Sequence, residues 1–282
     1  MNLFDQLVDS ALAAQPTLAS LRPAVEKEIL HHDILREMGK GGFLDSLTFI
    51  GGTCLRDCYG SARLSEDLGF TGGADFERES LSALGELLSR KIHDKYGLLV
   101  SVGEPRRESG NVDTWKIKVV TRPEQPHFPS QKINIDICAI ESRDRKPAMI
   151  RNHYRTDFGT SGMILKAESR EEIFADKILA IGLRPNRVKY RDIWDIIWLA
   201  NQGIGLDQAL LTLKLADRKA VPREFGILVR GRIEGLEIAY EEYLFEMRRF
   251  LPRQLVSEVE GQEGYWSFVL SILRDIARAL PE

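Results

Sequence analysis

Two neighbouring stretches of the sequence carry residue types suited to binding phosphate and a divalent cation. Residues 49–56 read Phe-Ile-Gly-Gly-Thr-Cys-Leu-Arg, and residues 63–70 read Arg-Leu-Ser-Glu-Asp-Leu-Gly-Phe. The apolar residues before Gly51-Gly52 predict a buried strand that ends in a glycine turn. Such a turn lets the backbone approach a ligand closely and point its amides at phosphate oxygens. Asp67, on the strand expected next, could hold the magnesium ion that accompanies a bound phosphate.

A second carboxylate lies in the middle of an apolar strand. Residues 132–140 carry isoleucine at alternate positions, so one face packs while Asn134, Asp136 and Cys138 share the other. A carboxylate at such a position is costly unless it is paired or bound to metal. An ion pair between Asp136 and an arginine is one explanation, and a magnesium–triphosphate site shared with Asp67 is the other. No Gly-Lys-Ser or Gly-Lys-Thr follows the glycines, so the layout favours a nucleotidyltransferase site over a P-loop.

Two helical segments further along the chain carry charged residues among apolar ones. Lys177 lies in the core-directed run of residues 171–183, where lysine is rarely found unless it is paired. We expect its ammonium either to pair with Asp136 or to reach the phosphates of a nucleotide. In the next helix, Asp192 and Asp195 are three positions apart. Asp192 is near the start of that helix, where a negative charge is also favoured by the helix dipole alone.

The spacing of apolar residues predicts helices, then a sheet, then helices to the end of the chain. Helical spacing is expected within residues 1–44 and 76–96. Short alternating or apolar runs predict strands at 47–50, 68–71, 98–102, 114–120, 132–140 and 148–154. From Ser169 onward the spacing is helical again. We therefore expect an α+β fold, a mixed sheet flanked by helices, in residues 1–167, and an all-helical C-terminal domain in residues 168–282.

The composition favours a globular protein without a membrane span. The chain has 282 residues, of which 43% are hydrophobic and 29% are charged, and a formal net charge of -3 at pH 7. No run approaches ~18 apolar residues, and residues 1–12 do not resemble a signal peptide. Three cysteines without a Cys-x-x-Cys pair fit a reduced cytoplasmic protein. Basic residues gather at 143–155 and 184–191, either in solvated loops or as the rim that a polyanion site would require.

Taken in order, these motifs resemble a known family. They are similar to the motifs of AbiEii/MenT nucleotidyltransferase toxins. The matching features are Gly-Gly-Thr-x-Leu-Arg, Arg-x-Ser-Glu-Asp-Leu, the strand acid, the helix lysine and Arg-Asp-x-x-Asp-Ile at 191–196. These toxins belong to bacterial type IV toxin–antitoxin and abortive-infection systems. The resemblance covers residues 45–200, and the helical remainder is compatible with it. It implies a polymerase-beta-like nucleotidyltransferase core and Mg²⁺-dependent transfer from an NTP to an RNA acceptor, in some relatives the tRNA 3′ end, which blocks translation. It also implies a cognate antitoxin encoded nearby.

The resemblance also assigns roles to single residues. It implies that Asp67, Asp136, Lys177 and Asp192 are catalytic, with Asp67 and Asp136 holding Mg²⁺. Nucleotide binding is assigned to the following set: Gly51, Gly52, Thr53, Arg56, Ser65 and Lys177. We expect Asp136 to take the proton of an attacking 3′-hydroxyl, and Arg56, Arg63 and the basic segments to hold the RNA backbone. Phosphorylation of Ser65 would place a dianion in the metal site and block the triphosphate.

One position departs from the family pattern. The family's strand usually reads Asp-x-Asp, but the second position here is Gly69. The chain could thus be an impaired natural homologue, a deliberately inactivated protein, or an enzyme that holds magnesium with Asp67, Asp136 and water. Two alternatives to RNA modification remain open. One is a non-catalytic module that binds a nucleotide or a protein, and the other is a nucleotidyltransferase acting on a small molecule, for which an anionic cleft is expected.

Overall fold

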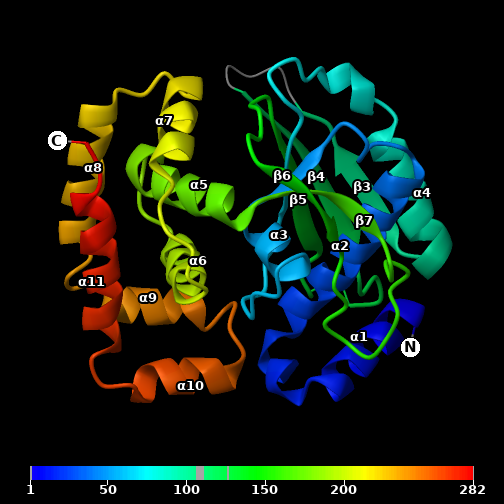
Figure 1. The fold of residues 1–282 in the computed structure, drawn as a ribbon. Helices are drawn as coiled ribbons and strands as arrows, with labels where there is room; N and C mark the ends of the chain where they lie inside the picture. Colours follow the sequence, from blue (N-terminus) through cyan, green and yellow to red (C-terminus); the bar gives the residue numbers. More distant parts are fainter. Residues whose placement is uncertain (1, 106–110, 126, 282) are drawn as a thin grey trace. The chain divides into compact units, whose positions relative to one another are not determined.

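The structure is a computed structural model that describes residues 2–105, 111–125 and 127–281. The chain forms two compact units, Met1–Glu168 and Ser169–Glu282, which we call the sheet unit and the helical unit. Figure 1 shows the sheet and its helices in blue to green, and the helical unit in green to red. None of the helices in the described ranges is both long and apolar enough to cross a bilayer.

The described strands of the sheet unit form one mixed sheet. Their order across the sheet is β3-β4-β5-β2-β1-β7-β6. The strands are β1 Thr48–Ile50, β2 Leu68–Thr71, β3 Leu99–Gly103, β4 Val112–Val120, β5 Gln131–Cys138, β6 Arg145–Met149 and β7 Ile164–Glu168. The pairs β2–β5 and β1–β7 are parallel, and the other neighbours are antiparallel. The sequence-based expectation of a mixed sheet flanked by helices is therefore confirmed.

Helices cover the apolar face of this sheet (Figure 1). The α-helices of the unit are α1 Leu3–Ala14, α2 Arg22–Lys40, α3 Gly51–Asp57 and α4 Leu84–Tyr96. Helix α2 packs against β5 and α4 packs against β3. Beneath them the alternate residues of β4 and β5 are buried, with Trp115 and Ile135 fully enclosed. Because the side chains of a strand alternate, this burial leaves Asp136 on the face away from α2 and α4.

Helix α2 buries an unusual number of polar side chains, which bind neighbouring elements. Asp33 accepts hydrogen bonds from Tyr96 Oη at 2.5 Å and from Arg36 Nη1 at 2.6 Å. Glu26 accepts from Gln131 Nε2 at 2.6 Å and also pairs with Arg122. A buried carboxylate is tolerated when charges and hydrogen bonds satisfy it in this way. These contacts fix α2 against α4 and against the first residue of β5.

Two buried histidines of α2 make the stability of the protein depend on pH. Burial lowers the pKa of His31 and of His32 to about 4. Histidines in the unfolded chain have pKa values of ~6.5. Between this pH and a pH of about 4, the unfolded chain therefore binds more protons than the folded chain. Each histidine should therefore lower the free energy of unfolding by up to about 1.4 kcal/mol per pH unit as the pH falls through this window. Urea unfolding at pH 7 and pH 5 measures the loss.

The control for this prediction is a double variant, His31→Gln with His32→Gln, measured under the same conditions. Glutamine keeps hydrogen-bonding capacity for Glu66 O and Thr160 Oγ1, the present partners of the two rings, but it does not titrate. Its unfolding free energy should fall less between the two pH values. Equal losses in the double variant and the natural chain would show that other groups control the effect.

The described part of the helical unit contains only helices. They are α5 Arg170–Leu183, α6 Tyr190–Asn201, α7 Gln208–Asp217, α8 Pro222–Glu234, α9 Tyr240–Met247, α10 Arg253–Gly261 and α11 Tyr265–Arg278. Helix α5 packs against α6, α7 and α8. Its N-terminus is capped by Ser169, whose hydroxyl accepts the amide of Glu172 at 3.1 Å. The expected all-helical C-terminal part is confirmed.

The structure differs from the sequence-based elements in three places. The helix expected at 76–96 begins only at Leu84, after a short 3-10 turn at Arg78–Leu81. The strand expected at 148–154 is β6, Arg145–Met149. This strand is at the edge of the sheet and is largely exposed, so it has no alternating apolar pattern. It contains Pro147, a residue type that is tolerated in edge strands. Strand β7 was not expected at all, because it is short and carries Lys166.

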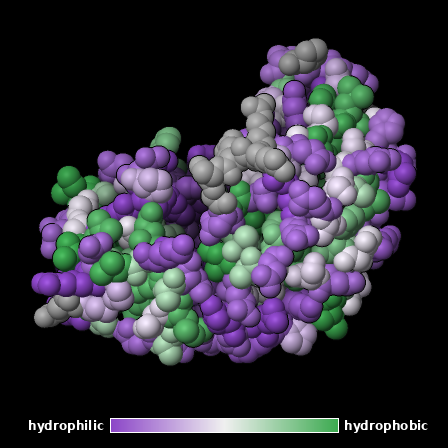
Figure 2. Space-filling model, turned by 90° about the horizontal axis from the view of Figure 1, so that it is seen from above, coloured by the Kyte–Doolittle hydropathy of each residue, from purple (hydrophilic) through white to green (hydrophobic). Residues whose placement is uncertain are grey.

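Hydrophilic residues cover much of the face shown in Figure 2, with hydrophobic residues interspersed among them. Most large apolar side chains are instead buried, including Phe49 and Phe70, whose ring centroids are 5.2 Å apart across β1 and β2. This packing fixes the two strands that carry the glycine turn and Asp67.

Candidate active site

The glycine turn between β1 and α3 has the geometry that only glycine supplies. Gly51 has φ 78°, a left-handed conformation that side chains with a Cβ rarely adopt. A Cβ built on Gly51 would meet no atom within 4 Å, whereas one on Gly52 would lie 2.3 Å from Arg63 Nη2 and 3.4 Å from Ser65 Oγ. Gly51 thus leaves open space for a ligand, and Gly52 allows Arg63 and Ser65 to lie against the turn.

Asp67 lies at the same edge of the sheet as this turn. Strands β1 and β2 are antiparallel with Ile50 opposite Gly69, so the end of β1 and the start of β2 meet. The hydroxyl of Thr53 donates a hydrogen bond to the backbone carbonyl of Asp67, which ties α3 to this position. The Thr53 side chain is buried, so any contact of Thr53 with a triphosphate is left to its backbone.

Asp67 is the residue directly before β2, and Asp136 lies on the adjacent strand β5. Strands β2 and β5 are parallel with Gly69 beside Asp136, so Asp67 falls beside Asn134. The amide of Asn134 donates to Asp67 Oδ1 at 3.0 Å. Asp67 and Asp136 are therefore diagonal neighbours, with Cα atoms about 8 Å apart by ordinary strand spacing. Two carboxylates in this relation can converge on one cation.

The carboxylate of Asp136 is oriented by a neighbouring strand. Thr114 of β4 is the register partner of Asp136, and its hydroxyl donates to Asp136 Oδ1 at 2.7 Å. Both side chains are half-buried rather than enclosed. The prediction of an acid on the face opposite to the isoleucines is thus matched by the register, and Thr114 is a further polar residue that the sequence did not single out.

Gly69 occupies the position directly between Ile50 and Asp136. A Cβ at residue 69 would lie 3.3 Å from Ile50 Cγ1 and 3.5 Å from Ile50 O. The first distance is tight, but the half-exposed Ile50 side chain has room to move. A carboxylate at position 69 would face the same way as Asp136, because the two positions are register partners on adjacent strands.

Arg56, which the resemblance assigned to nucleotide binding, has its hydrogen-bond partners inside the sheet unit. Arg56 Nε donates to Glu28 Oε1 at 2.7 Å, and Arg56 Nη1 donates to the carbonyl of Ser61 at 3.0 Å. Only 6% of the residue is exposed. Arg63, which was expected to hold RNA together with Arg56, is buried and donates to the carbonyl of Leu64 at 2.9 Å. Neither guanidinium reaches the surface, which sequence spacing alone does not reveal.

Lys177 and Asp192 come together in the helical unit. Lys177 Nζ lies 2.8 Å from Asp192 Oδ1 and 2.7 Å from Asp195 Oδ2. Arg184 is a further partner of Asp192. Burial would raise the pKa of Asp192, but Lys177 and Arg184 hold it well below its usual range. Asp195, fully buried, was not assigned a role from sequence, although its spacing from Asp192 was a usable signal.

Three lysines lie on β4 and β5, on the face of the sheet that carries Asp136. Lys116 and Lys118 of β4 are register partners of Asn134 and Lys132 of β5. All three lysines are exposed, on the same side as Asp136. A row of positive charges at such a site attracts polyanions. The alternation of lysine with Trp115, Ile117 and Val119 in the sequence was the signal for this row.

Part of the predicted basic rim lines a groove in the sheet unit. The groove has a volume of about 930 Å³ and contains Arg145 and Lys146 together with Arg36, Lys40 and Lys166. It is formed at β6, β7 and the end of α2, so β1 lies between the groove and strands β2 and β5. The groove can receive an anion, but none of its lining residues belongs to the glycine turn or the carboxylate pair.

The mixed sheet, the glycine turn and the two nearby carboxylates are the features expected of a nucleotidyltransferase. The sequence profile described as "Nucleotidyl transferase AbiEii toxin, Type IV TA system" matches residues 33–273. The chain therefore belongs to the AbiEii family of nucleotidyltransferase toxins of type IV toxin–antitoxin systems. The resemblance inferred from the motifs is confirmed.

Solved structures share the fold. The chain is similar to MenT4, a nucleotidyltransferase toxin from Mycobacterium tuberculosis H37Rv, with a TM-score of 0.57, 17% identity, and coverage of 97% of this chain and 98% of that one. It is also similar to a protein described as a nucleotidyltransferase from Helicobacter pylori, with a TM-score of 0.50, 15% identity and coverage of 90% and 95%. A comparison with curated protein sequences gives no match. At these identities the structural likeness concerns the fold alone.

Proposed function

We propose that this chain transfers a nucleotide from an NTP to the 3′-hydroxyl of an RNA acceptor, with the tRNA 3′ end as the target, in a Mg²⁺-dependent reaction that blocks translation. The observation that supports the proposal is that Asp67, near the glycine turn, accepts the amide of Asn134, which is two residues before Asp136 on β5. An antitoxin encoded nearby would keep the activity in check, as the toxin–antitoxin family implies.

The residues at this site fit a magnesium ion. Asp67 and Asp136 offer carboxylate oxygens, and Thr114 adds a hydroxyl next to Asp136. Mg²⁺ prefers such oxygen ligands and usually takes one or two carboxylates with water and substrate phosphates. When bound, the ion would offset the negative charge of the triphosphate. The open space at Gly51 gives the phosphates an approach to the backbone amides of the turn.

The chemistry that remains for the protein is positioning and proton transfer. We propose that Asp136 accepts the proton of the attacking 3′-hydroxyl. The oxygen of that hydroxyl forms a bond to the α-phosphorus of the NTP, while the bond from this phosphorus to pyrophosphate breaks. Thr114 keeps the Asp136 carboxylate in one orientation through its 2.7 Å hydrogen bond. Most of the rate enhancement in phosphoryl-type transfer comes from such positioning together with charge stabilisation.

We assign Lys177 to neutralising the triphosphate and Asp192 to holding that lysine. Two carboxylates within 2.8 Å fix the position of the ammonium group. Because these carboxylates already balance its charge, Lys177 would have to share or exchange a partner to touch a phosphate. This assignment therefore treats Asp192 as a positioning residue.

The acceptor is proposed to be RNA because of the charge on the open face. Lys116, Lys118 and Lys132 share the side of the sheet that carries Asp136. Phosphate contacts of this kind supply most of the affinity for a nucleic acid. A cationic small molecule such as an aminoglycoside would need an anionic cleft instead, so these lysines disfavour a small-molecule acceptor. The basic segment at 143–155 would extend the RNA surface.

The test is a labelling reaction with purified protein, MgCl₂, each labelled NTP and total tRNA. Labelled tRNA, lost when EDTA is added, is the expected result. Mapping the label to the 3′ end would identify the acceptor position. Tight NTP binding without transfer to tRNA or to total cellular RNA would instead support the non-catalytic module that Gly69 favours.

Restoring an acid at position 69 should raise the transfer activity. Gly69→Asp would add a carboxylate on the same face as Asp136, and we expect an increase of about tenfold to a hundredfold. The matched control is Gly69→Ala, which makes the same Cβ contact with Ile50 but adds no ligand. Initial rates of tRNA labelling measure the effect. No gain in Gly69→Asp over Gly69→Ala, with both proteins folded, would exclude position 69 as a ligand position.

A further inference from the structure

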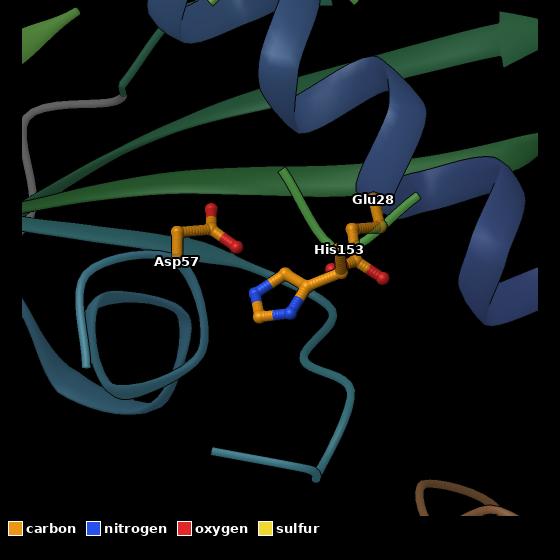
Figure 3. A group of neighbouring side chains, drawn as sticks. All are labelled: Glu28, Asp57 and His153. Carbon is orange, nitrogen blue, oxygen red and sulfur yellow. The ribbon is translucent and has the colours of Figure 1, made fainter. Parts of the chain in front are cut away.

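A second group of potential metal ligands is buried elsewhere in the sheet unit. Glu28 comes from α2, Asp57 from the end of α3, and His153 from the segment that follows β6 (Figure 3). One ligand atom from each residue lies within 4.8 Å of the others. None of the three belongs to the glycine turn or to the Asp67–Asp136 pair, so the group is separate from the proposed magnesium site.

Asp57 is the member of the group that most requires a ligand. The residue is 0% exposed, and neither carboxyl oxygen has a hydrogen-bond partner among the described residues. Figure 3 shows its carboxyl group directed toward the other two side chains. Burial, with the nearby charge of Glu28, raises the pKa of Asp57 well above its usual range. A buried carboxyl group without a partner is costly, and a cation would remove that cost.

His153 is oriented as a ligand by its backbone contact. Its Nε2 lies 2.9 Å from the carbonyl oxygen of Arg56. A carbonyl only accepts hydrogen bonds, so the proton is on Nε2 and the lone pair is on Nδ1. Metal-binding histidines commonly donate their other ring nitrogen to a carbonyl or carboxylate in this way.

Glu28 is held in place by two further groups. Arg56 Nε donates to Glu28 Oε1 at 2.7 Å, and Tyr154 Oη donates to Glu28 Oε2 at 2.6 Å. Outer contacts of this type orient metal ligands in known sites.

We propose that Glu28, Asp57 and His153 form a structural site for a divalent transition-metal ion such as Zn²⁺. One imidazole nitrogen and two carboxylate oxygens suit zinc, whereas magnesium prefers oxygen ligands alone. Ligands of one zinc ion lie about 3–4 Å apart when each is about 2 Å from the metal, so small side-chain shifts close the site. A cavity of about 540 Å³ lined by His153 and neighbouring residues offers a route of entry.

The site has a structural consequence for the glycine turn. Asp57 is the last residue of α3, and Gly51 and Gly52 are the first. An ion that joins Asp57 to α2 and to the segment after β6 would hold the short helix at its far end. The backbone amides of the turn would then be fixed relative to Asp67 by the ion as well as by the Thr53 hydrogen bond.

The test uses the full chain, freed of metal with EDTA and dialysed, with Zn²⁺ alone as the probe. Calorimetric titration should show one zinc ion per chain bound with a Kd of about 10 µM or tighter. Saturating zinc should raise the Tm by at least about 3 °C, and the same concentration of Mg²⁺ should not. Asp57→Asn and His153→Gln should each weaken zinc binding by at least about a hundredfold. The double variant Asp67→Asn with Asp136→Asn should bind zinc like the natural chain.

X-ray absorption of the zinc-loaded natural chain makes the test independent of the folding of the variants. We expect nitrogen and oxygen ligands only. A zinc–sulfur distance of ~2.3 Å would place the ion on Cys54 or Cys58, which are buried in α3 and directly after it, and would overturn the proposal. It would also be overturned if the natural chain bound no zinc, or if Asp57→Asn bound zinc with unchanged affinity.

Discussion

Asp136→Asn is expected to reduce nucleotidyl transfer by about a hundredfold to ten-thousandfold, the range associated with loss of a general base. The amide keeps the size of the side chain and can still bond to Thr114, so the strand pairing of β5 should survive. It loses the negative charge that would hold magnesium and accept the proton of the 3′-hydroxyl. Initial rates of tRNA labelling at saturating NTP, with the unfolding transition recorded for each protein, measure the effect.

Asp113→Asn is the matched control for this variant. Asp113 is the neighbour of Thr114 on β4 and pairs with Ile137 in the register, so it projects from the opposite side of the sheet. Its carboxylate lies 3.4 Å from Arg78, at a partly exposed position where an ion pair contributes little. Its labelling rate should stay close to that of the natural chain. Full activity in Asp136→Asn would mean that this carboxylate neither binds magnesium nor takes the proton.

Lys177→Ala is expected to abolish detectable transfer and also to destabilise the helical unit. Removal of the ammonium leaves the buried Asp192 and Asp195 without their shared partner, which typically costs about 3–5 kcal/mol. The loss should appear in urea unfolding monitored by circular dichroism. Transfer should fail even at low temperature, where the variant is still folded, because the charge assigned to the triphosphate is missing.

Two further variants separate the stabilising role of Lys177 from its catalytic role. In Lys177→Met with Asp192→Asn and Asp195→Asn, the buried charges are removed together, so most of the stability should return while transfer stays lost. Lys214→Met removes another buried lysine of the same unit, which pairs with Glu172 and Asp176 at 2.8 Å each. It should lose stability but keep the transfer rate of the folded protein. Recovery of transfer in the triple variant would show that Lys177 acts only on stability.

The placement of Asp136 was predictable from the sequence because a strand has a period of two. Isoleucine at alternate positions of residues 132–140 identified the buried face, and the opposite face followed directly. The relation of Asp67 to Asp136 was a weaker inference, since it depends on which strands pair and in which register. The glycine turn, in contrast, was recognisable from residue types alone, because few side chains tolerate its conformation.

The sequence failed where a residue's role depends on a partner far along the chain. From the sequence, Arg56 is expected to bind a ligand because it follows the glycine turn. In the structure, it forms a buried ion pair with Glu28 of α2. Strand β6 was misplaced because an exposed edge strand has no buried face to mark it. Asp57 gave no signal at all, since its significance arises only when α2, α3 and the segment after β6 are brought together.

The most direct test of the central claim is a crystal structure of the chain with a non-hydrolysable NTP analogue and Mn²⁺ in place of Mg²⁺, located by its anomalous scattering. The account predicts a manganese peak about 2.0–2.3 Å from carboxylate oxygens of both Asp67 and Asp136, with the triphosphate against Gly51 and Gly52. A nucleotide bound elsewhere in the sheet unit, such as in the groove of Lys40 and Arg145, with no metal between the two aspartates, would contradict it.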